Sequence, residues 1–176
     1  MPFDFVTPAQ AGAQLKRIRN WFPAFAGMTM LFAAPALAQD KQPPYWASIA
    51  SGQAMTHTGP GRTYPNVWLY QRRDLPVRVL KKYETWRLIQ DPDGAQGWVL
   101  VTMLSDRRTA IVKAGDPRPV YVAPDRSSHV RYLLQPGVVG RIDHCREGWC
   151  RITVGDRKGY ILTSELWGVG ADEVVD

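Results

Sequence analysis

The chain has 176 residues, of which 45% are hydrophobic and 22% charged, a balance that excludes an intrinsically disordered protein. The formal net charge is +6; residues 1–38 carry three positive charges and one negative charge, which leaves +4 for residues 39–176. A small basic excess without runs of like charge does not indicate a nucleic-acid-binding protein, and we expect no nucleic-acid partner.

Residues 1–38 have the pattern of an export signal. A basic flank precedes the apolar stretch 21–37, and Ala36 and Ala38 supply the small residues of a cleavage site. Prolines and a glycine interrupt the apolar stretch, which disfavours the alternative of a retained membrane anchor. We therefore expect a cleaved signal peptide and a periplasmic protein without a membrane span after signal removal. The Pro-rich, polar residues 39–53 predict a linker or an extended arm, which Tyr45 and Trp46 could dock.

Residues 54–108 predict a first small β-domain. Short runs of β-forming residues separated by turn residues predict strands at 55–58, 68–71, 75–80, 86–89 and 97–100. Within 75–80, Val77 and Val79 are expected to face a core while Arg78 faces water, because side chains alternate along a strand.

The hairpin pattern of residues 86–100 is repeated at 149–162. In each copy, two runs of β-forming residues flank a polar turn cluster, which is typical of a hairpin. The similarity continues beyond the hairpin, because Thr102 and Ser164 each stand two positions before a leucine. The repeat therefore predicts a duplicated domain, with the second copy at 109–168.

Residues 105–108 break the hydrophobic pattern and mark the expected boundary between the two copies. The next run, 109–112, predicts a strand that either opens the second copy or adds to the sheet of the first. Residues 169–176 are acidic and predict a solvated, fraying tail.

Several of these motifs, in this order, resemble the bacterial SH3-like (SH3b) domain, and more narrowly the exported tandem SH3b proteins of alphaproteobacteria. The resemblance covers about residues 54–168 and implies an all-β fold of two five-to-six-stranded, strongly bent antiparallel barrels, preceded by a signal segment. Relatives often carry Asn-Val-Arg where this sequence has 55–58. The motifs are Gly59-Pro60-Gly61, Tyr64-Pro65, the strand 75–79, Trp86-Arg87, Asp93-Gly94, Gly97-Trp98-Val99, 107–110 and the second-copy hairpin from Cys145 to Arg151.

Cys145 and Cys150 are expected to form a structural disulfide. A tight turn near Glu147 brings the two Cα atoms within disulfide distance across neighbouring strands. An even cysteine count in an exported chain favours the bridge. His144 adjoins Cys145 but is expected on the opposite sheet face, so a zinc site is disfavoured.

The sequence gives little support to catalysis. A Cys/His hydrolase needs an activated cysteine with an orienting histidine, whereas both cysteines are better explained by pairing. The three histidines have no metal-ligand spacing, and the sequence contains no Gly-x-Ser-x-Gly elbow. We therefore expect no catalytic residue, no metal and no cofactor.

The aromatic residues are too numerous for two tiny cores to enclose. Tyr64 and Trp68, beside the Gly-Pro loop, are expected to be exposed, while Trp98 is expected to cap the barrel end. Exposed aromatic rings suit peptide or glycan binding, and arginines pair with carboxylates. The expected binding residues are Arg62, Tyr64, Trp68, Arg72, Arg73, Trp86 and Trp98.

Together these features favour a non-catalytic, exported binding protein that recognises a peptidoglycan peptide or an envelope protein. Two alternatives stay open: an envelope scaffold without glycan binding, and an accessory module of a cell-wall hydrolase system. The fold does not choose among them, since function varies widely on small barrels.

Overall fold

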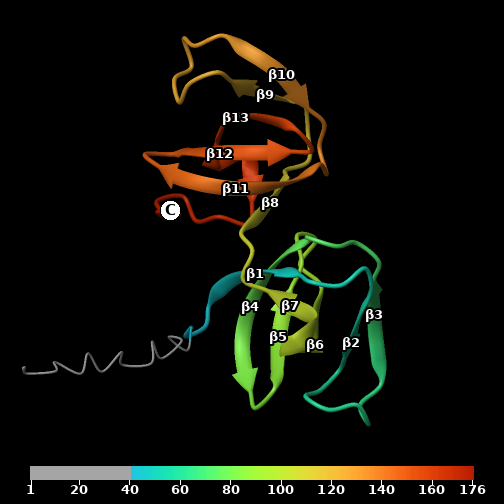
Figure 1. The fold of residues 1–176 in the computed structure, drawn as a ribbon. Coiled ribbons are helices and arrows are strands. Elements are labelled where there is room, and N and C mark those ends of the chain that lie inside the picture. Colours follow the sequence, from blue (N-terminus) through green and yellow to red (C-terminus); the bar gives the residue numbers. More distant parts are fainter. Residues whose placement is uncertain (1–40) are drawn as a thin grey trace, which may run out of the picture. The chain divides into compact units, whose positions relative to one another are not determined.

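A computed structural model describes residues 41–176, and their fold is all-β, as the sequence predicts (Figure 1). The expected signal segment at 1–38 lies outside the described residues. Between residues 41 and 176, the helical segments are two short 3₁₀ turns, η1 (Val101–Met103) and η2 (Thr163–Glu165). No helix in this part of the chain is long and apolar enough to cross a membrane.

The first sheet has seven antiparallel strands in the order β3-β2-β6-β5-β4-β1-β7. The hairpin partners β2 and β3, β4 and β5, and β5 and β6 are neighbours both in the sheet and in sequence. The strand β1, in contrast, lies between β4 and β7, which follow it much later in the chain. The strands are β1 (Tyr45–Ile49), β2 (Ala54–His57), β3 (Asn66–Tyr70), β4 (Pro76–Tyr83), β5 (Trp86–Gln90), β6 (Gln96–Leu100) and β7 (Leu104–Ser105).

The second sheet repeats this topology in the order β10-β9-β13-β12-β11-β8-β14. Each strand takes the place of the strand seven positions earlier, so the predicted tandem is confirmed, with seven strands per copy where five or six were expected. The strands are β8 (Thr109–Val112), β9 (Arg118–Tyr121), β10 (Val130–Leu134), β11 (Val139–Arg146), β12 (Trp149–Val154), β13 (Arg157–Leu162) and β14 (Leu166–Trp167).

The linker predicted at 39–53 is wrong over residues 45–49, which form β1. This strand pairs with β4 and β7, and Ala47, Ser48 and Ile49 are buried. The equivalent strand of the second copy is β8, which pairs with β11 and β14. Residues 109–112 therefore open the second sheet and do not add to the first.

Each sheet encloses its own core. Val77 and Val79 are fully buried while Arg78 is exposed, as the alternation predicts. The first core consists of Ala47, Ile49, Ala54, Tyr70, Val77, Val79, Ile89 and Val99. The second consists of Ala110, Val112, Val120, Leu134, Ile142, Cys145, Cys150, Ile152, Ile161, Leu166, Val169 and Val175.

Glycines allow strands β6 and β13 to pack closely on their neighbours. A Cβ atom added to Gly97 would lie 2.7 Å from the Thr56 Cβ, and one added to Gly159 would lie 2.4 Å from a methyl group of Val120. Real side chains do not approach so closely, so both positions require glycine. This contact explains why a glycine precedes the aromatic residue at the same place in both copies.

Asp91 organises the turn between β5 and β6. Its Oδ1 accepts hydrogen bonds from the backbone N–H groups of Asp93 and Ala95, at 3.0 and 2.8 Å, as in an Asx turn. Its Oδ2 accepts the phenol hydrogen of Tyr70 at 3.1 Å. Burial of the phenol, reinforced by the negative charge of Asp91, raises the pKa of Tyr70 far above its ordinary value of 10.0. The turn is thereby tied to the first core.

The predicted disulfide between Cys145 and Cys150 is confirmed. Both residues are fully buried in the second core. The intervening turn has positive φ angles at Glu147 (53°) and Gly148 (78°), the backbone geometry that two-residue hairpin turns prefer. The bridge therefore joins β11 to β12 directly beside their connecting turn.

The tail at 169–176 is packed, contrary to the predicted fraying. Val169 and Val175 are each only 8% exposed, and Val175 exchanges two backbone hydrogen bonds with Cys145, of 2.9 and 3.1 Å. The guanidinium of Arg108 donates to both carboxylate oxygens of Glu173. Acidic composition made this segment look solvated, but its valines complete the second core.

The two barrels touch within the compact unit formed by residues 39–176. Trp46 of β1 meets Trp167 of β14 edge to face, with ring centroids 4.8 Å apart. Arg78 places its guanidinium 5.7 Å from the Trp46 ring centroid, and Arg72 donates to the Gly137 carbonyl at 2.9 Å. The copies thus pack against each other through aromatic and main-chain contacts.

Candidate binding site

A row of large side chains covers the outer face of strands β2, β5 and β6. Ile89 and Val99 point into the first core, so their sequence neighbours point the other way. Directly opposite partners in an antiparallel pair share a face, and the register pairs Trp86 with Leu100, Leu88 with Trp98, and His57 with Trp98. These side chains form one apolar surface, which we call the aromatic face.

One end of the aromatic face is hollowed into a cavity of about 280 Å³, which we call the Trp86 pocket. The indole of Trp86 is only 8% exposed, and His57 meets it edge to face, with ring centroids 5.4 Å apart. The 3₁₀ turn η1 closes one side, while the loop after β2 contributes a cation. The lining residues are Met55, His57, Arg62, Trp86, Leu100 and Met103.

The loop between β2 and β3 is held in shape by Tyr64. A Cβ on Gly59 would lie 2.4 Å from the Tyr64 ring, and one on Gly61 would lie 3.2 Å from it. The Tyr64 carbonyl is 3.0 Å from Nδ1 of His57, which orients the imidazole beside Trp86. This arrangement places the exposed side chain of Arg62 at the edge of the Trp86 pocket.

The structure brings only some of the predicted binding residues together. Arg62 and Trp86 line the Trp86 pocket, and Trp98 lies on the same aromatic face. Tyr64 supports the loop and is 48% exposed. Trp68 is 58% exposed but lies opposite Thr56, whose side chain faces inward, so it is placed away from the pocket.

The remaining predicted arginines also lie outside the pocket. Arg72 is engaged with the Gly137 carbonyl, and Arg73 is exposed on the loop before β4. Sequence reasoning missed four lining residues, namely Met55, His57, Leu100 and Met103. The alternation of Met55 and His57 along one strand was the available signal for two of them, because it puts both on one face.

The second barrel carries a related but chemically different face. Tyr121 pairs with Tyr160 as His57 pairs with Trp98, and Tyr121 meets Trp149 edge to face with centroids 5.4 Å apart. At the place of Met103 in η1, the turn η2 carries Glu165. Burial raises the pKa of Glu165, an effect partly offset by nearby arginines. The first copy therefore offers an apolar pocket where the second presents an acid.

The described residues contain no group of three or more His, Cys, Asp or Glu side chains able to hold a metal ion. Both cysteines of the chain are consumed by the disulfide, which leaves no thiolate for a Cys/His hydrolase mechanism. What the Trp86 pocket offers chemically is an apolar floor, two aromatic rings and a guanidinium.

Two bent antiparallel barrels, each carrying an aromatic pair on its outer face, define a tandem of SH3-like modules. The chain belongs to the bacterial SH3 domain family, whose pattern it matches over residues 51–106 and again over 114–168. Domains of this family are typically cell-wall binding modules and are generally not catalytic. The family and the disulfide are both characteristic of extracytoplasmic proteins.

No curated protein matches the sequence significantly. Among solved structures, NlpC1 from Trichomonas vaginalis matches with a TM-score of 0.33 and 15% sequence identity, over 73% of this chain and 47% of that protein. NlpC2 from the same organism matches with a TM-score of 0.32 and 16% identity, over 72% of this chain and 49% of that protein. The chain thus spans about half the length of each of these two proteins.

Proposed function

We propose that this chain is an exported, non-catalytic binding protein whose Trp86 pocket recognises a peptide of the cell wall. The observation that carries the proposal is the pocket itself, which combines a nearly buried indole with a guanidinium at its edge. An apolar floor suits the methyl and methylene groups of short peptides, and the guanidinium of Arg62 pairs with their carboxylates. Membership of a family of wall-binding modules supports this choice.

The test is co-sedimentation of residues 39–176 with purified peptidoglycan sacculi. The wild-type chain is expected in the pellet at low and moderate salt, and Arg62→Ala is expected to bind about tenfold more weakly, because a charge-assisted hydrogen bond is lost. Arg62 is exposed, so this variant should fold normally. Arg73→Ala, which removes an exposed arginine outside the pocket, is the matched control and should bind as the wild type does.

A second variant probes the pocket floor. Met103→Glu gives the first barrel the residue that the second carries at the same place, and it should abolish sedimentation. Because Met103 packs partly against the first core, circular dichroism is recorded to separate loss of binding from loss of fold. Trp68→Ala serves as the aromatic control, because Trp68 is exposed and away from the pocket. Wild-type protein that stays in the supernatant, or variants that all sediment equally, would exclude the wall peptide.

The second candidate function is an envelope scaffold that docks onto another protein. It is favoured by exposed apolar residues on the edge strands β3 and β10, since such strands are ready partners for another chain. Crosslinking in the native envelope would separate the candidates. A scaffold should form crosslinks to its partner protein through β3 or β10, and Met103→Glu should leave those crosslinks unchanged. The exposed residues are Val67, Trp68, Leu69, Val130 and Leu133.

Both functions require export. The proposed cleavage after Ala38 predicts a mature protein that begins at Gln39. N-terminal sequencing of the protein recovered from the periplasm tests this directly, and a retained first segment would support the membrane-anchor alternative.

A further inference from the structure

A polar row crosses three strands of the second sheet, on the face opposite its core. The register places Thr109 of β8 opposite Arg141 of β11, and Arg141 opposite Thr153 of β12. Directly opposite residues share a face, so the two hydroxyl groups flank the guanidinium-bearing side chain. Gly140 and Ile142, the neighbours of Arg141, are buried on the other face.

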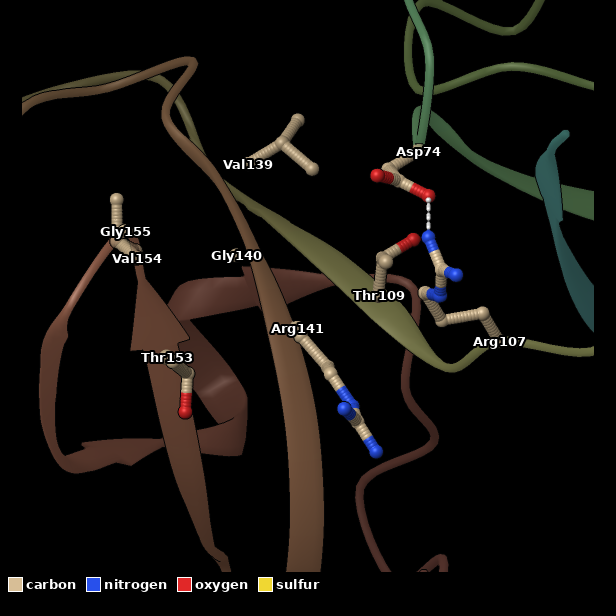
Figure 2. A pocket seen from close by; sticks show the side chains of 9 residues that line it. All are labelled: Asp74, Arg107, Thr109, Val139, Gly140, Arg141, Thr153, Val154 and Gly155. Atoms are coloured by element: carbon tan, nitrogen blue, oxygen red, sulfur yellow. Dashed lines mark hydrogen bonds and ion pairs between the residues drawn. The ribbon is translucent and has the colours of Figure 1, made fainter. Parts of the chain in front are cut away.

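This row forms one wall of a cavity of about 370 Å³, distinct from the Trp86 pocket (Figure 2). Asp74 and Arg107 stand across from the row, joined by an ion pair of 2.9 Å between Oδ1 and Nη1. Figure 2 shows the Thr109 hydroxyl directed to the side of the cavity where this pair lies. The site is thus built from neighbouring strands on one wall and, on the other, from two loops that are joined by this ion pair.

Thr109 and Arg141 carry donors that no described residue uses. Thr109 is only 3% exposed, yet its Oγ1 makes no hydrogen bond within the described residues, and leaving a buried hydroxyl unpaired is costly. The exposed side chain of Arg141 makes no hydrogen bond or ion pair with any described residue, although its charge helps to lower the pKa of Asp143. The acidic neighbour of Arg141, Asp143, is already paired with Arg151, with 2.5 Å between Oδ1 of Asp143 and Nε of Arg151.

The charges of the cavity favour a single negative charge. Arg107 and Arg141 contribute two positive charges and Asp74 one negative charge, which leaves an excess of one. Asp74 is satisfied by Arg107, so Arg141 is the cation available to a ligand. The Asp74 carboxylate would repel a dianion such as phosphate more strongly than a monoanionic carboxylate, whose single negative charge matches the excess of one.

We propose that this cavity binds a carboxylate, such as the free C-terminus of a short peptide. Arg141 pairs with the carboxylate through charge-assisted hydrogen bonds, and the hydroxyl group of Thr109 donates to one of its oxygens. Binding would satisfy the buried Thr109 hydroxyl, which otherwise lacks a partner. The proposal does not depend on what the Trp86 pocket recognises.

The test is an NMR titration of ¹⁵N-labelled residues 39–176 with N-acetyl-alanyl-alanine, its C-terminal amide and inorganic phosphate. The free acid is expected to shift the backbone amides of Thr109, Arg141 and Thr153 in a saturable way at millimolar concentrations. The amide and phosphate are expected to leave them in place. Equal shifts with the amide, shifts with phosphate alone, or no saturable shift with the acid would each overturn the proposal.

Variants assign the interaction to particular groups. Arg141→Gln should weaken binding of the acid about tenfold or more, because the ion pair is lost, whereas Arg131→Gln removes an exposed arginine outside the cavity and should change nothing. Thr109→Val should weaken binding while leaving the melting temperature equal or higher, since it removes an unpaired buried hydroxyl. Unchanged affinity in Arg141→Gln would contradict the assignment.

Discussion

His57 meets Trp86 edge to face, with ring centroids 5.4 Å apart and ring planes at 88°. Tyr121 meets Trp149 in the second barrel at the same distance and at 87°. The pairs occupy equivalent positions, because His57 is opposite Trp98 and Tyr121 is opposite Tyr160 in the strand register. The two copies have therefore kept the packing of the ring pair while its chemistry has changed.

This equivalence predicts that His57→Tyr is well tolerated. The tyrosine should take the orientation that Tyr121 has in the second barrel, so the free energy of unfolding should stay within about 1 kcal/mol of wild type. His57→Ala should cost more, because edge-to-face aromatic contacts contribute about 0.5–1.5 kcal/mol beyond buried area. Urea unfolding measures both variants, and equal losses in the two would contradict the shared geometry.

Gly159→Ala is expected to destabilise the second barrel. The added methyl group would lie 2.4 Å from Val120 and 2.8 Å from the Tyr121 carbonyl oxygen, and overpacking of this kind costs about 1–3 kcal/mol. Gly52→Ala is the matched control, because a Cβ there meets nothing within 4 Å. Thermal melts of both variants provide the comparison; a loss of the same size in Gly52→Ala would refute the steric explanation.

Reduction of the disulfide should weaken only the second barrel. Loop closure over a separation of five residues corresponds to about 2 kcal/mol in the chain-entropy treatment. The first barrel has Lys82 opposite Arg87 at the same place in its hairpin and should not respond to reductant. Hydrogen exchange with and without reductant distinguishes the two barrels, and faster exchange in β4 and β5 would contradict this independence.

The ion pair between Arg108 and Glu173 should make the free energy of unfolding depend on pH in the acid range. Burial alone would raise the pKa of Glu173, but the hydrogen bonds from Arg108 and the Gly170 N–H outweigh it, so the pKa lies below its ordinary value of 4.5. A carboxyl whose pKa is lower when folded stabilises the protein above pH 4.5 and loses that contribution as pH falls through the folded-state pKa.

Glu173→Gln should therefore flatten the acid side of the stability profile. Between neutral pH and about pH 3, the wild type should lose more unfolding free energy than the variant, in proportion to the protons that Glu173 takes up. Urea unfolding across this range measures the difference. Parallel profiles for the two proteins would show that the contact with Arg108 contributes nothing.

Much of the fold was predictable because its signals are local. Alternation along 75–80 identified the buried valines, and the repeated hairpins identified the duplication. The pairing of Cys145 with Cys150 needed only a tight turn between them. The strand β1 was missed because the neighbouring prolines 43 and 44 are typical of a linker, while its partners β4 and β7 lie far along the chain.

The site was only partly predictable for the same reason. Trp86 and Arg62 belong to motifs that can be recognised in sequence, and both line the pocket. His57 and Met103 come from different elements, and only the strand register and the position of η1 bring them together. Trp68 shows the converse, since its exposure was expected but the register turns it away from the pocket.

The two sheets share no strand, and each is drawn from one unbroken stretch of chain. The amino-terminal barrel can therefore complete its hydrogen bonding while the carboxy-terminal one is still being synthesised, because the last strand that closes each sheet, β7 or β14, belongs to that same stretch. Such an order suits a chain that folds during synthesis, because it shortens the time for which apolar surface and unpaired strand edges are exposed.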